Sequence, residues 1–355
     1  MADMLLLSPV TLGALELRNR LVMAPMTRNR ATPDGLPTPM MTTYYTQRSS
    51  AGLIITEMTQ ITPEAVGYMN TPGIHSAEQV AAWRTITEAV HAAGGRIVMQ
   101  LGHAGRISHP LLIGGLTPVA PSAIRPEGKC FTPQGQLPYE TPRALATEEL
   151  PTIVAQFRHA AAMAKEAGFD GVELHSANGY LLDEFLRSGT NKRTDGYGGS
   201  VENRTRLLLE VASAAGEVWG PGRVGVRVSP FNSFNSMHDD QPLETFPAVA
   251  RLLDALSLAY LHISYGGSSV EQRPEMIARM RSAFGGPIIA NAGYDVERAE
   301  TALKAKEAEA IAFGVPFIAN PDLPARFARG AELNAADPAT FYMGTEVGYI
   351  DYPNL

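Results

Sequence analysis

The sequence predicts an α/β fold of the TIM-barrel type, a (β/α)8 arrangement in which eight parallel strands alternate with helices around a closed barrel. Eight short apolar runs recur along the chain, and longer segments with a helical period separate them. The length of 355 residues suits one barrel with insertions. Because no sharp linker divides the chain, we expect a single domain over residues 1–355.

An N-terminal β-hairpin precedes the first expected barrel strand. Residues 9–19 alternate apolar and polar side chains around a turn that contains Gly13. Since this hairpin comes directly before a buried strand, we expect it to close the floor of the barrel. The expected barrel strands cover residues 21–24, 53–58, 97–101, 171–174, 224–228, 260–264, 287–291 and 310–313.

The intervening helices are marked by residues that favour helix ends. Ser76, Ser200 and Asp295 each stand directly before a helical pattern, where their side chains can accept a hydrogen bond from the first turn. Gly94 and Gly168 follow two of the patterns and can end them. The helices are expected to begin near residues 39, 77, 147, 180, 201, 243, 274, 296 and 321.

Two segments interrupt this alternation. Residues 102–146 are rich in Pro and Gly and show no clear period. A loop of this length in a compact domain is usually a functional cover, and it leaves the C-terminal end of the third strand. We therefore expect a long capping loop over the barrel mouth. Residues 188–199 are expected to have a structural role, with Arg193 and Asp195 holding the loop in place.

Composition excludes several classes of protein. A net charge of -7 disfavours a nucleic-acid binder, whose binding surface would be basic. The single cysteine, Cys130, rules out a disulfide within the chain, a Cys-rich zinc site and an iron–sulfur cluster. No metal-ligand spacing of His with Asp or Glu is evident, and no metal is expected. Without a basic N-terminal region or a membrane-length apolar run, the default is a soluble, cytoplasmic protein.

The stretch that carries most chemical information is residues 171–186, with the sequence GVELHSANGYLLDEFL. It predicts a strand, a polar turn and a helix, the place where a barrel positions its chemistry. His175 and Asn178 can both donate to one acceptor oxygen, and Tyr180 stays protonated because a free phenol titrates near about 10. Such a set can polarise a carbonyl and deliver a proton. Alternatively, the His satisfies local backbone, the Asn makes the turn and the Tyr packs.

Other strand ends add uncharged donors and one cation. Thr27, Gln100 and Arg227 lie at or near the ends of three expected strands. A buried Arg needs an anionic partner, and a reduced flavin is one candidate. Gly293 and Gly314 follow the last two strands, where barrels often bind phosphate, although glycines there can also serve only as turns.

Several other features are expected to be structural or are missing. His103, His109 and His262 are expected to have structural roles in the protein. No pair of carboxylates faces across the strand ends, which disfavours glycosidase chemistry, and no G-x-S-x-G motif occurs.

Six motifs resemble one family. They are residues 24–28 (APMTR), 100–106 (QLGHAGR), 175–186 (HSANGYLLDEFL), 191–200 (NKRTDGYGGS), 318–323 (IANPDL) and 351–353 (DYP). On these residues the chain resembles the old yellow enzyme family of flavin-dependent ene-reductases, and it looks closest to the branch of N-ethylmaleimide and nitrate-ester reductases. The resemblance runs from about residue 5 to residue 353.

The resemblance implies a non-covalent FMN across the barrel mouth, with NADPH or NADH as the reductant. Thr27 matches the residue that bonds the flavin carbonyl near N5, Gln100 matches the ligand of the pyrimidine edge, and Arg227 matches the cation near N1. The remaining positions that match the family's cofactor site, mostly through backbone, are Pro25, Met26, Met58, Gly293, Gly314 and Val315.

The resemblance also implies the substrate site. His175 and Asn178 match the pair that grips the substrate oxygen, and Tyr180 matches the proton donor. Positions that match the walls of the substrate cavity are Tyr68, Gly102 and Tyr342.

Two positions depart from the family. Val315 stands where the family usually has Arg, so a side-chain cation for the phosphate is lost. We expect either weaker FMN binding or another Arg in its place. Gly102 stands where many members of the branch have Trp, which is expected to enlarge or reshape the pocket.

The implied activity is that of an FMN-dependent ene-reductase. NAD(P)H reduces FMN, which transfers hydride to the β-carbon of an α,β-unsaturated carbonyl, maleimide or nitro compound, and Tyr180 donates the proton. The expected partners are small-molecule, electron-poor alkenes, with neither nucleic acid nor membrane, and the expected state is a monomer or weak homodimer. Two alternatives remain at this stage: a barrel hydrolase or lyase acting on a phosphorylated substrate, and a flavin-binding protein without turnover.

Overall fold

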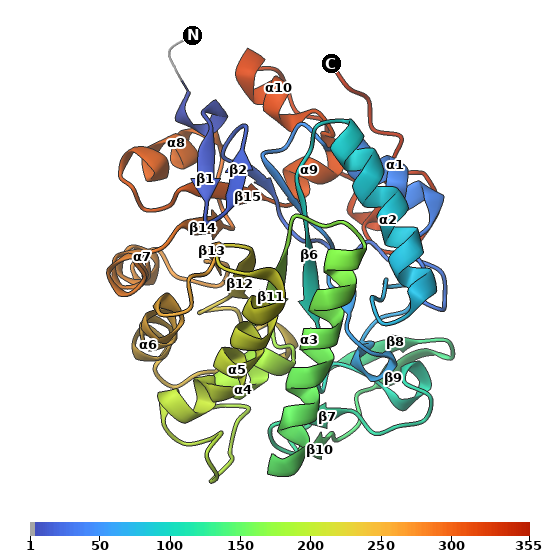
Figure 1. Cartoon of the computed structure of the whole chain (residues 1–355), viewed down its shortest axis with the longest axis vertical. Coiled ribbons are helices and arrows are strands. Elements are labelled where there is room, and N and C mark those ends of the chain that lie inside the picture. Colours follow the sequence, from blue (N-terminus) through green and yellow to red (C-terminus); the bar gives the residue numbers. More distant parts are fainter. Residues whose placement is uncertain (1–3) are drawn as a thin grey trace.

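The computed structural model describes residues 4–355, and residues 1–3 of the predicted domain lie outside the described residues. Eight parallel strands form a closed ring, because β11 pairs with both β12 and β6 (Figure 1). The ring consists of β3 (Leu21–Met23), β4 (Leu53–Ile55), β6 (Ile97–Gly102), β11 (Gly171–His175), β12 (Val224–Val228), β13 (Tyr260–Ser264), β14 (Ile288–Asn291) and β15 (Ala310–Phe313). The predicted TIM barrel is confirmed.

Burial explains why these strands read as apolar runs rather than as alternating patterns. Every residue of the eight barrel strands is buried. Helices cover the outer face of a parallel barrel and side chains fill its interior, so both faces of each strand are shielded from water. A short additional strand, β5 (Thr59–Gln60), pairs with the end of β6.

The predicted helix caps are present. The side chains of Ser76, Ser200 and Asp295 each accept a hydrogen bond from a backbone N–H in the first turn of the helix that follows. The α-helices are α1 (Pro39–Gln47), α2 (Ala77–Ala92), α3 (Leu150–Glu166), α4 (Leu181–Leu186), α5 (Val201–Trp219), α6 (Pro242–Asp254), α7 (Gln272–Ala283), α8 (Val296–Lys304), α9 (Val315–Ala319) and α10 (Leu323–Arg329). Short 3-10 turns are η1 (Leu5–Leu7), η2 (Pro63–Ala65), η3 (Pro110–Leu112), η4 (Thr147–Glu149), η5 (Phe234–Ser236) and η6 (Pro338–Thr340).

Some predicted boundaries were wrong, and one helix was not predicted. The second strand ends at Ile55 rather than at residue 58, and the last helix begins at Leu323 rather than at residue 321. Helix α9 was not predicted, because its five residues continue the apolar run of β15 and carry no period of their own. None of the helices in residues 4–355 combines the length and the apolar character needed to span a membrane.

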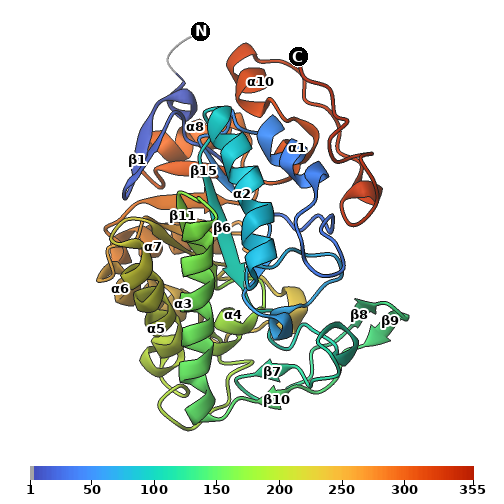
Figure 2. The same cartoon turned by 45° about the vertical axis from the view of Figure 1, so that its right-hand side comes forward.

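The N-terminal hairpin closes one end of the barrel. Strands β1 (Val10–Leu12) and β2 (Leu15–Leu17) pair in antiparallel fashion around Gly13. Leu12, Leu15 and Leu17 are buried in one apolar cluster with barrel residues that include Leu53 and Tyr260. Figure 2 shows the hairpin at the end of the barrel from which β6 starts. The predicted floor of the barrel is confirmed.

The segment between β6 and α3 lies at the opposite end. In Figure 2, β6 points toward the region that holds β7 (Val119–Ala120), β8 (Lys129–Thr132), β9 (Gly135–Pro138) and β10 (Arg143–Ala144). The predicted cap after the third strand therefore lies on the side of the mouth. Its β8–β9 hairpin was not predicted, because these four-residue strands are half exposed and too short to show a period. The neighbouring loop is held as expected, since Arg193 Nε donates to Asp195 Oδ1 at 3.0 Å.

The floor hairpin offers a test of its packing. Leu15 is 2% exposed, so Leu15→Ala leaves a cavity under the barrel and should lower the free energy of unfolding by about 2–5 kcal/mol. Thr11→Ala, on the exposed side of the same hairpin, should change it by less than about 0.5 kcal/mol. Equilibrium denaturation in urea measures both values, and equal effects of the two variants would contradict this packing.

Candidate active site

The end of β11 presents a compact set of polar side chains. His175 is the last residue of β11, and Tyr180 is the N-cap residue of α4. Asn178 and Gly179 adopt left-handed backbone angles, with φ of 58° and 81°, which Asn and Gly tolerate best. This sharp turn brings the His175 and Tyr180 rings into edge contact, with centroids 4.8 Å apart. The predicted trio is therefore assembled at one strand end.

The Tyr180 hydroxyl lies 3.0 Å from the hydroxyl of Tyr68. Tyr180 is buried, Tyr68 is half-buried, and their rings meet edge to face. Burial raises the pKa of Tyr180 to about 12 and raises the pKa of Tyr68 well above its ordinary value. Both groups are therefore protonated at neutral pH, and Tyr180 has a proton to give.

The His175 imidazole is neutral. Burial, with contributions from Arg227 and His262, lowers the pKa of His175 well below its ordinary value. Its Nδ1 is buried and has no hydrogen-bond partner among residues 4–355. A neutral imidazole donates from only one of its two ring nitrogens, so His175 can offer one donor to a ligand.

Asn178 supplies a second donor. Its backbone N–H donates to Ser229 Oγ at 2.8 Å, and its side-chain Oδ1 accepts from Asn232 Nδ2 at 2.7 Å. Its backbone carbonyl accepts from Asn235 Nδ2 at 2.8 Å. These bonds leave Asn178 Nδ2 without a partner among residues 4–355, so this N–H pair is free to bind a ligand oxygen.

Arg227 is a buried cation beside this set. It is the neighbour of His175 across the β11–β12 ladder, and its Nη2 donates to Asn291 Oδ1 at 3.0 Å. Its Nε is buried without a partner, and no carboxylate within residues 4–355 forms an ion pair with it. Burial lowers the pKa of Arg227 because the charge has lost its water. Such a cation is stabilised by an anionic ligand, which fits a flavin that becomes negative when reduced.

Gln100 lies on the adjacent strand and is oriented by a buried acid. Its Nε2 donates to Glu173 Oε1 at 2.7 Å. The other oxygen of Glu173 lies 2.9 Å from His262 Nδ1, and both residues are fully buried. His262 is therefore a core residue, as predicted. His103 and His109 each accept a backbone N–H two residues later in the chain, which agrees with the structural roles expected for them.

The remaining predicted contacts surround the mouth. Pro25, Met26 and Thr27 follow β3 and are half-buried. A Cβ atom added at Gly102 would lie 2.4 Å from Met58 Cγ, so the Met58 side chain occupies the space beside Gly102. The effect of Gly102 on the shape of the substrate pocket stays a prediction. Tyr342 is 64% exposed on the C-terminal segment.

The last two strand ends carry the predicted glycines and an unpredicted arginine. Gly293 follows β14 with φ of 69°, Gly314 follows β15, and the Val315 side chain is 52% exposed and uncharged. Arg273 of α7 donates from Nη2 to the Ala292 carbonyl at 2.7 Å. Its Nη1 lies 3.0 Å from where a Cβ atom at Gly293 would stand, and its Nε is buried without a partner within residues 4–355.

Sequence reasoning missed Glu173, Asn232 and Arg273 as parts of the site. Glu173 sits inside an apolar strand, and its acid could have been noted as a polar residue that needs a buried partner. Asn232 lies in a loop and Arg273 lies in a helix. The local sequence around each of them gives no indication of the residue that it contacts in the fold. Only the packing of β12 and α7 against the mouth brings them there.

Comparison with known proteins shows the family to which this chain is similar. Residues 5–334 match the family described as the NADH:flavin oxidoreductase / NADH oxidase family. A Leishmania infantum protein named "Probable flavin mononucleotide-dependent alkene reductase" is 42% identical over 355 residues, covering 98% of this chain and 97% of that protein.

Solved structures are similar over the same span. Morphinone reductase in complex with tetrahydroNAD is 51% identical, with a TM-score of 0.95 over 99% of this chain and 97% of the other. The old yellow enzyme homologue from Zymomonas mobilis is 44% identical, with a TM-score of 0.95 over 99% of both chains.

The chain therefore belongs to the NADH:flavin oxidoreductase / NADH oxidase family, and it is an enzyme of the old yellow enzyme type. FMN as the cofactor and a nicotinamide nucleotide as the reductant are confirmed at the level of this family. The donor set described above, with its unpaired buried cation, fits such a cofactor.

The neutral state of His175 has a measurable consequence. Because burial and Arg227 lower its pKa, no protonation of this imidazole should occur between about pH 6 and pH 8. The affinity for an uncharged carbonyl ligand, measured by titration against the flavin absorbance, should therefore be constant over this range. An inflection near the ordinary histidine pKa of about 6.5 that disappears in His175→Asn would contradict this assignment.

Proposed function

We propose that this enzyme reduces the electron-poor carbon–carbon double bond of α,β-unsaturated carbonyl, maleimide and nitro compounds. The observation that carries the proposal is the convergence of His175, Asn178 and Tyr180 beside the buried, unpaired Arg227. Relatives named as alkene reductase and as 12-oxophytodienoate reductase support the same chemistry. They give no support to the alternative of a hydrolase or lyase.

The substrate oxygen would lie between two donors. The single N–H of the neutral His175 imidazole and the free Nδ2 of Asn178 can both point at one carbonyl or nitro oxygen. Hydrogen bonds to this oxygen draw electron density from the conjugated alkene and make its β-carbon electrophilic. Donors that are already in place stabilise the charge that develops on the oxygen during reduction.

FMN, when bound and reduced by NAD(P)H, supplies the hydride that the β-carbon accepts. The Tyr180 hydroxyl then protonates the α-carbon as a general acid. Its raised pKa keeps this proton in place until a strong carbon base forms. Tyr68, whose hydroxyl lies 3.0 Å away, can donate a hydrogen bond to the phenolate that Tyr180 becomes.

The cofactor would be held by strand-end residues. Arg227 would meet the pyrimidine side of the ring where negative charge collects, Gln100 and Thr27 would bond its polar edge, and the backbone of Pro25, Met26 and Met58 would line it. At the other end of the cofactor, the backbone at Gly293, Gly314 and Val315 would receive the phosphate. Arg273 lies beside Gly293 with an unpaired Nε, and we propose that it supplies the cation that Val315 lacks.

The proton-donor role separates two half-reactions. In Tyr180→Phe, reoxidation of the reduced enzyme by cyclohexenone should slow by about 100- to 10,000-fold, the usual contribution of a general acid. Anaerobic flavin reduction by NAD(P)H should stay within a few fold of the wild type. Stopped-flow absorbance measures both rates, with Tyr197→Phe, whose hydroxyl contacts Glu210, as the control. Equal loss of both half-reactions would refute the assignment.

The role of Arg273 is specific to the phosphate. Arg273→Ala should weaken FMN binding to the apoprotein by about 10- to 100-fold, the loss expected for a charge-assisted hydrogen bond. The affinity of the same variant for riboflavin, which has no phosphate, should equal that of the wild type. The control is Arg298→Ala, because Arg298 also lies over the Tyr294 ring but, among residues 4–355, forms no hydrogen bond to the Ala292 carbonyl. Quenching of flavin fluorescence measures each affinity, and an equal loss for riboflavin would contradict the role.

The activity itself is tested by anaerobic reduction of the purified protein with NADH and with NADPH, followed by reoxidation with a panel of enones, maleimides and nitroalkenes. Reoxidation that yields the saturated product supports the proposal. A bound flavin that neither nucleotide reduces would favour a binding protein instead. The cytoplasmic location and the monomer or weak homodimer stay predictions.

A further inference from the structure

We propose that Asn232 is a positioning residue that determines which end of the Asn178 amide faces the substrate. The inference rests on the proposed function, in which Asn178 donates to the substrate oxygen. An Asn side chain ends in an acceptor and a donor of nearly the same shape, and a rotation of the amide exchanges them. Only Nδ2 can bind an oxygen that is itself an acceptor. A neighbouring group must therefore select the orientation of the amide in which Nδ2 faces the substrate.

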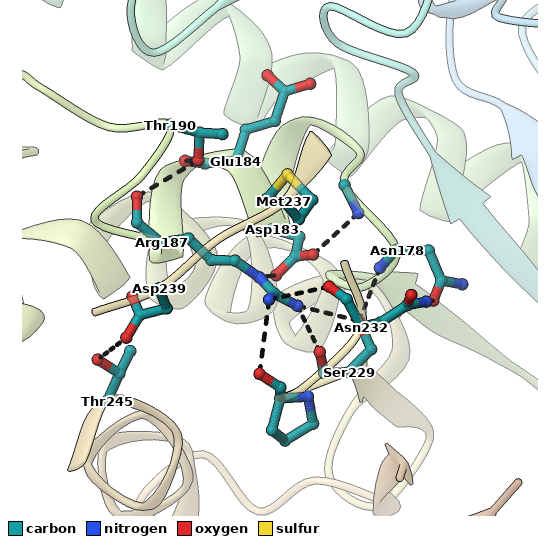
Figure 3. A network of polar contacts seen from close by, with 12 residues as sticks. Asn178, Asp183, Glu184, Arg187, Thr190, Ser229, Asn232, Met237, Asp239 and Thr245 are labelled. Carbon is teal, nitrogen blue, oxygen red and sulfur yellow. Dashed lines mark hydrogen bonds and ion pairs between the residues drawn. The ribbon is translucent and has the colours of Figure 1, made fainter. Parts of the chain in front are cut away.

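Two consecutive hydrogen bonds, the first from a backbone N–H, select this orientation. The Phe234 N–H donates to Asn232 Oδ1 at 2.9 Å, which turns Asn232 Nδ2 toward Asn178. Asn232 Nδ2 then donates to Asn178 Oδ1 at 2.7 Å (Figure 3). Because a backbone N–H and an amide nitrogen can only donate, each bond is possible in only one orientation of the acceptor. Asn178 Nδ2 is thereby turned away from the loop.

One buried ion pair holds both ends of this arrangement. Arg187 Nε donates to Asp183 Oδ1 at 2.9 Å, and both side chains are almost fully buried. Asp183 Oδ2 accepts the N–H of Gly179 at 2.9 Å, directly after Asn178, while Arg187 Nη1 donates to the Asn232 carbonyl at 3.1 Å (Figure 3). The turn after β11 and the loop after β12 are therefore anchored on the same pair.

The loop after β12 is held in place by contacts that do not involve the Asn232 side chain. Arg187 holds the loop through backbone carbonyls, including that of Ser229, and Ser229 Oγ binds the Asn178 N–H. None of these bonds uses the Asn232 amide. A substitution of this half-buried side chain should thus alter the orientation of Asn178 while the loop stays in place.

Asn232→Asp tests the selection directly. The new carboxylate can still accept the Phe234 N–H, but its second oxygen faces Asn178 Oδ1, and the repulsion is relieved when the Asn178 amide rotates. Asn178 then presents an oxygen to the substrate oxygen. We expect the dissociation constant of a para-substituted phenol, followed by flavin absorbance in the holoenzyme, to rise about 10- to 100-fold. The KM for cyclohexenone should rise with it.

Two controls separate rotation of the amide from the added charge. Ser233→Asp places the same charge on the adjacent, exposed residue and should leave phenol affinity within about twofold of the wild type. In an Asn178→Ala background, Asn232→Asp should have no further effect, because no amide remains to rotate. Asn232→Ala removes the donor without adding a charge and should give a smaller loss, about 3- to 10-fold. It serves as the second variant if Asn232→Asp fails to fold.

The outcomes distinguish this inference from the proposed function. If Asn178→Ala weakens phenol binding and neither Asn232 variant does, the positioning role is wrong and the function stands. If Asn232→Asp weakens binding equally in the Asn178→Ala background, charge alone explains the loss and the inference is overturned. If Asn178→Ala itself has no effect, the oxygen-gripping role in the proposed function fails, and the role of Asn232 fails with it.

Discussion

The hydrogen bonding that closes the barrel between β6 and β11 is the constraint on which the rest of the structure depends. This pairing sets Gln100 opposite Glu173, and the next ladder sets His175 opposite Arg227. Since all eight strands are parallel, their C-terminal ends meet at one mouth, whichever part of the chain they come from. Polar groups 73 and 52 positions apart in the sequence thus become neighbours.

The site combines polar residues of the barrel strands with residues of a turn that buried hydrogen bonds hold in place. Strand residues form a buried polar layer, in which Glu173 holds both Gln100 and His262, while Arg227 forms no ion pair with a carboxylate of residues 4–355. Asn178 and Tyr180 belong to the turn after β11. The buried Asp183–Arg187 pair holds this turn, because Asp183 accepts the N–H of Gly179. A site built this way can orient a planar cofactor and a substrate with little motion of its own groups, which limits the reorganisation needed during the reaction.

Two glycines at the mouth are approached by side chains of other elements. The Met58 side chain packs beside Gly102. Arg273 of α7 reaches the Gly293 end of the mouth, where we propose that it meets the cofactor phosphate. In both cases the side chain comes from another part of the chain, because the ring places the ends of adjacent elements within reach of one another.

The sequence by itself determined the closed barrel, its floor hairpin, most helix starts and the trio at the end of β11. These features depend on local patterns: apolar runs for strands buried on both faces, cap residues for helices, and the Asn178–Gly179 turn. Only the tertiary structure decided the partners of those residues. The contact of Tyr68 with Tyr180, the bond from Asn232 to Asn178 and the approach of Arg273 to Gly293 join residues that are 112, 54 and 20 positions apart in the sequence. Such contacts leave no period in the sequence, because they depend on the direction in which each side chain leaves a packed element.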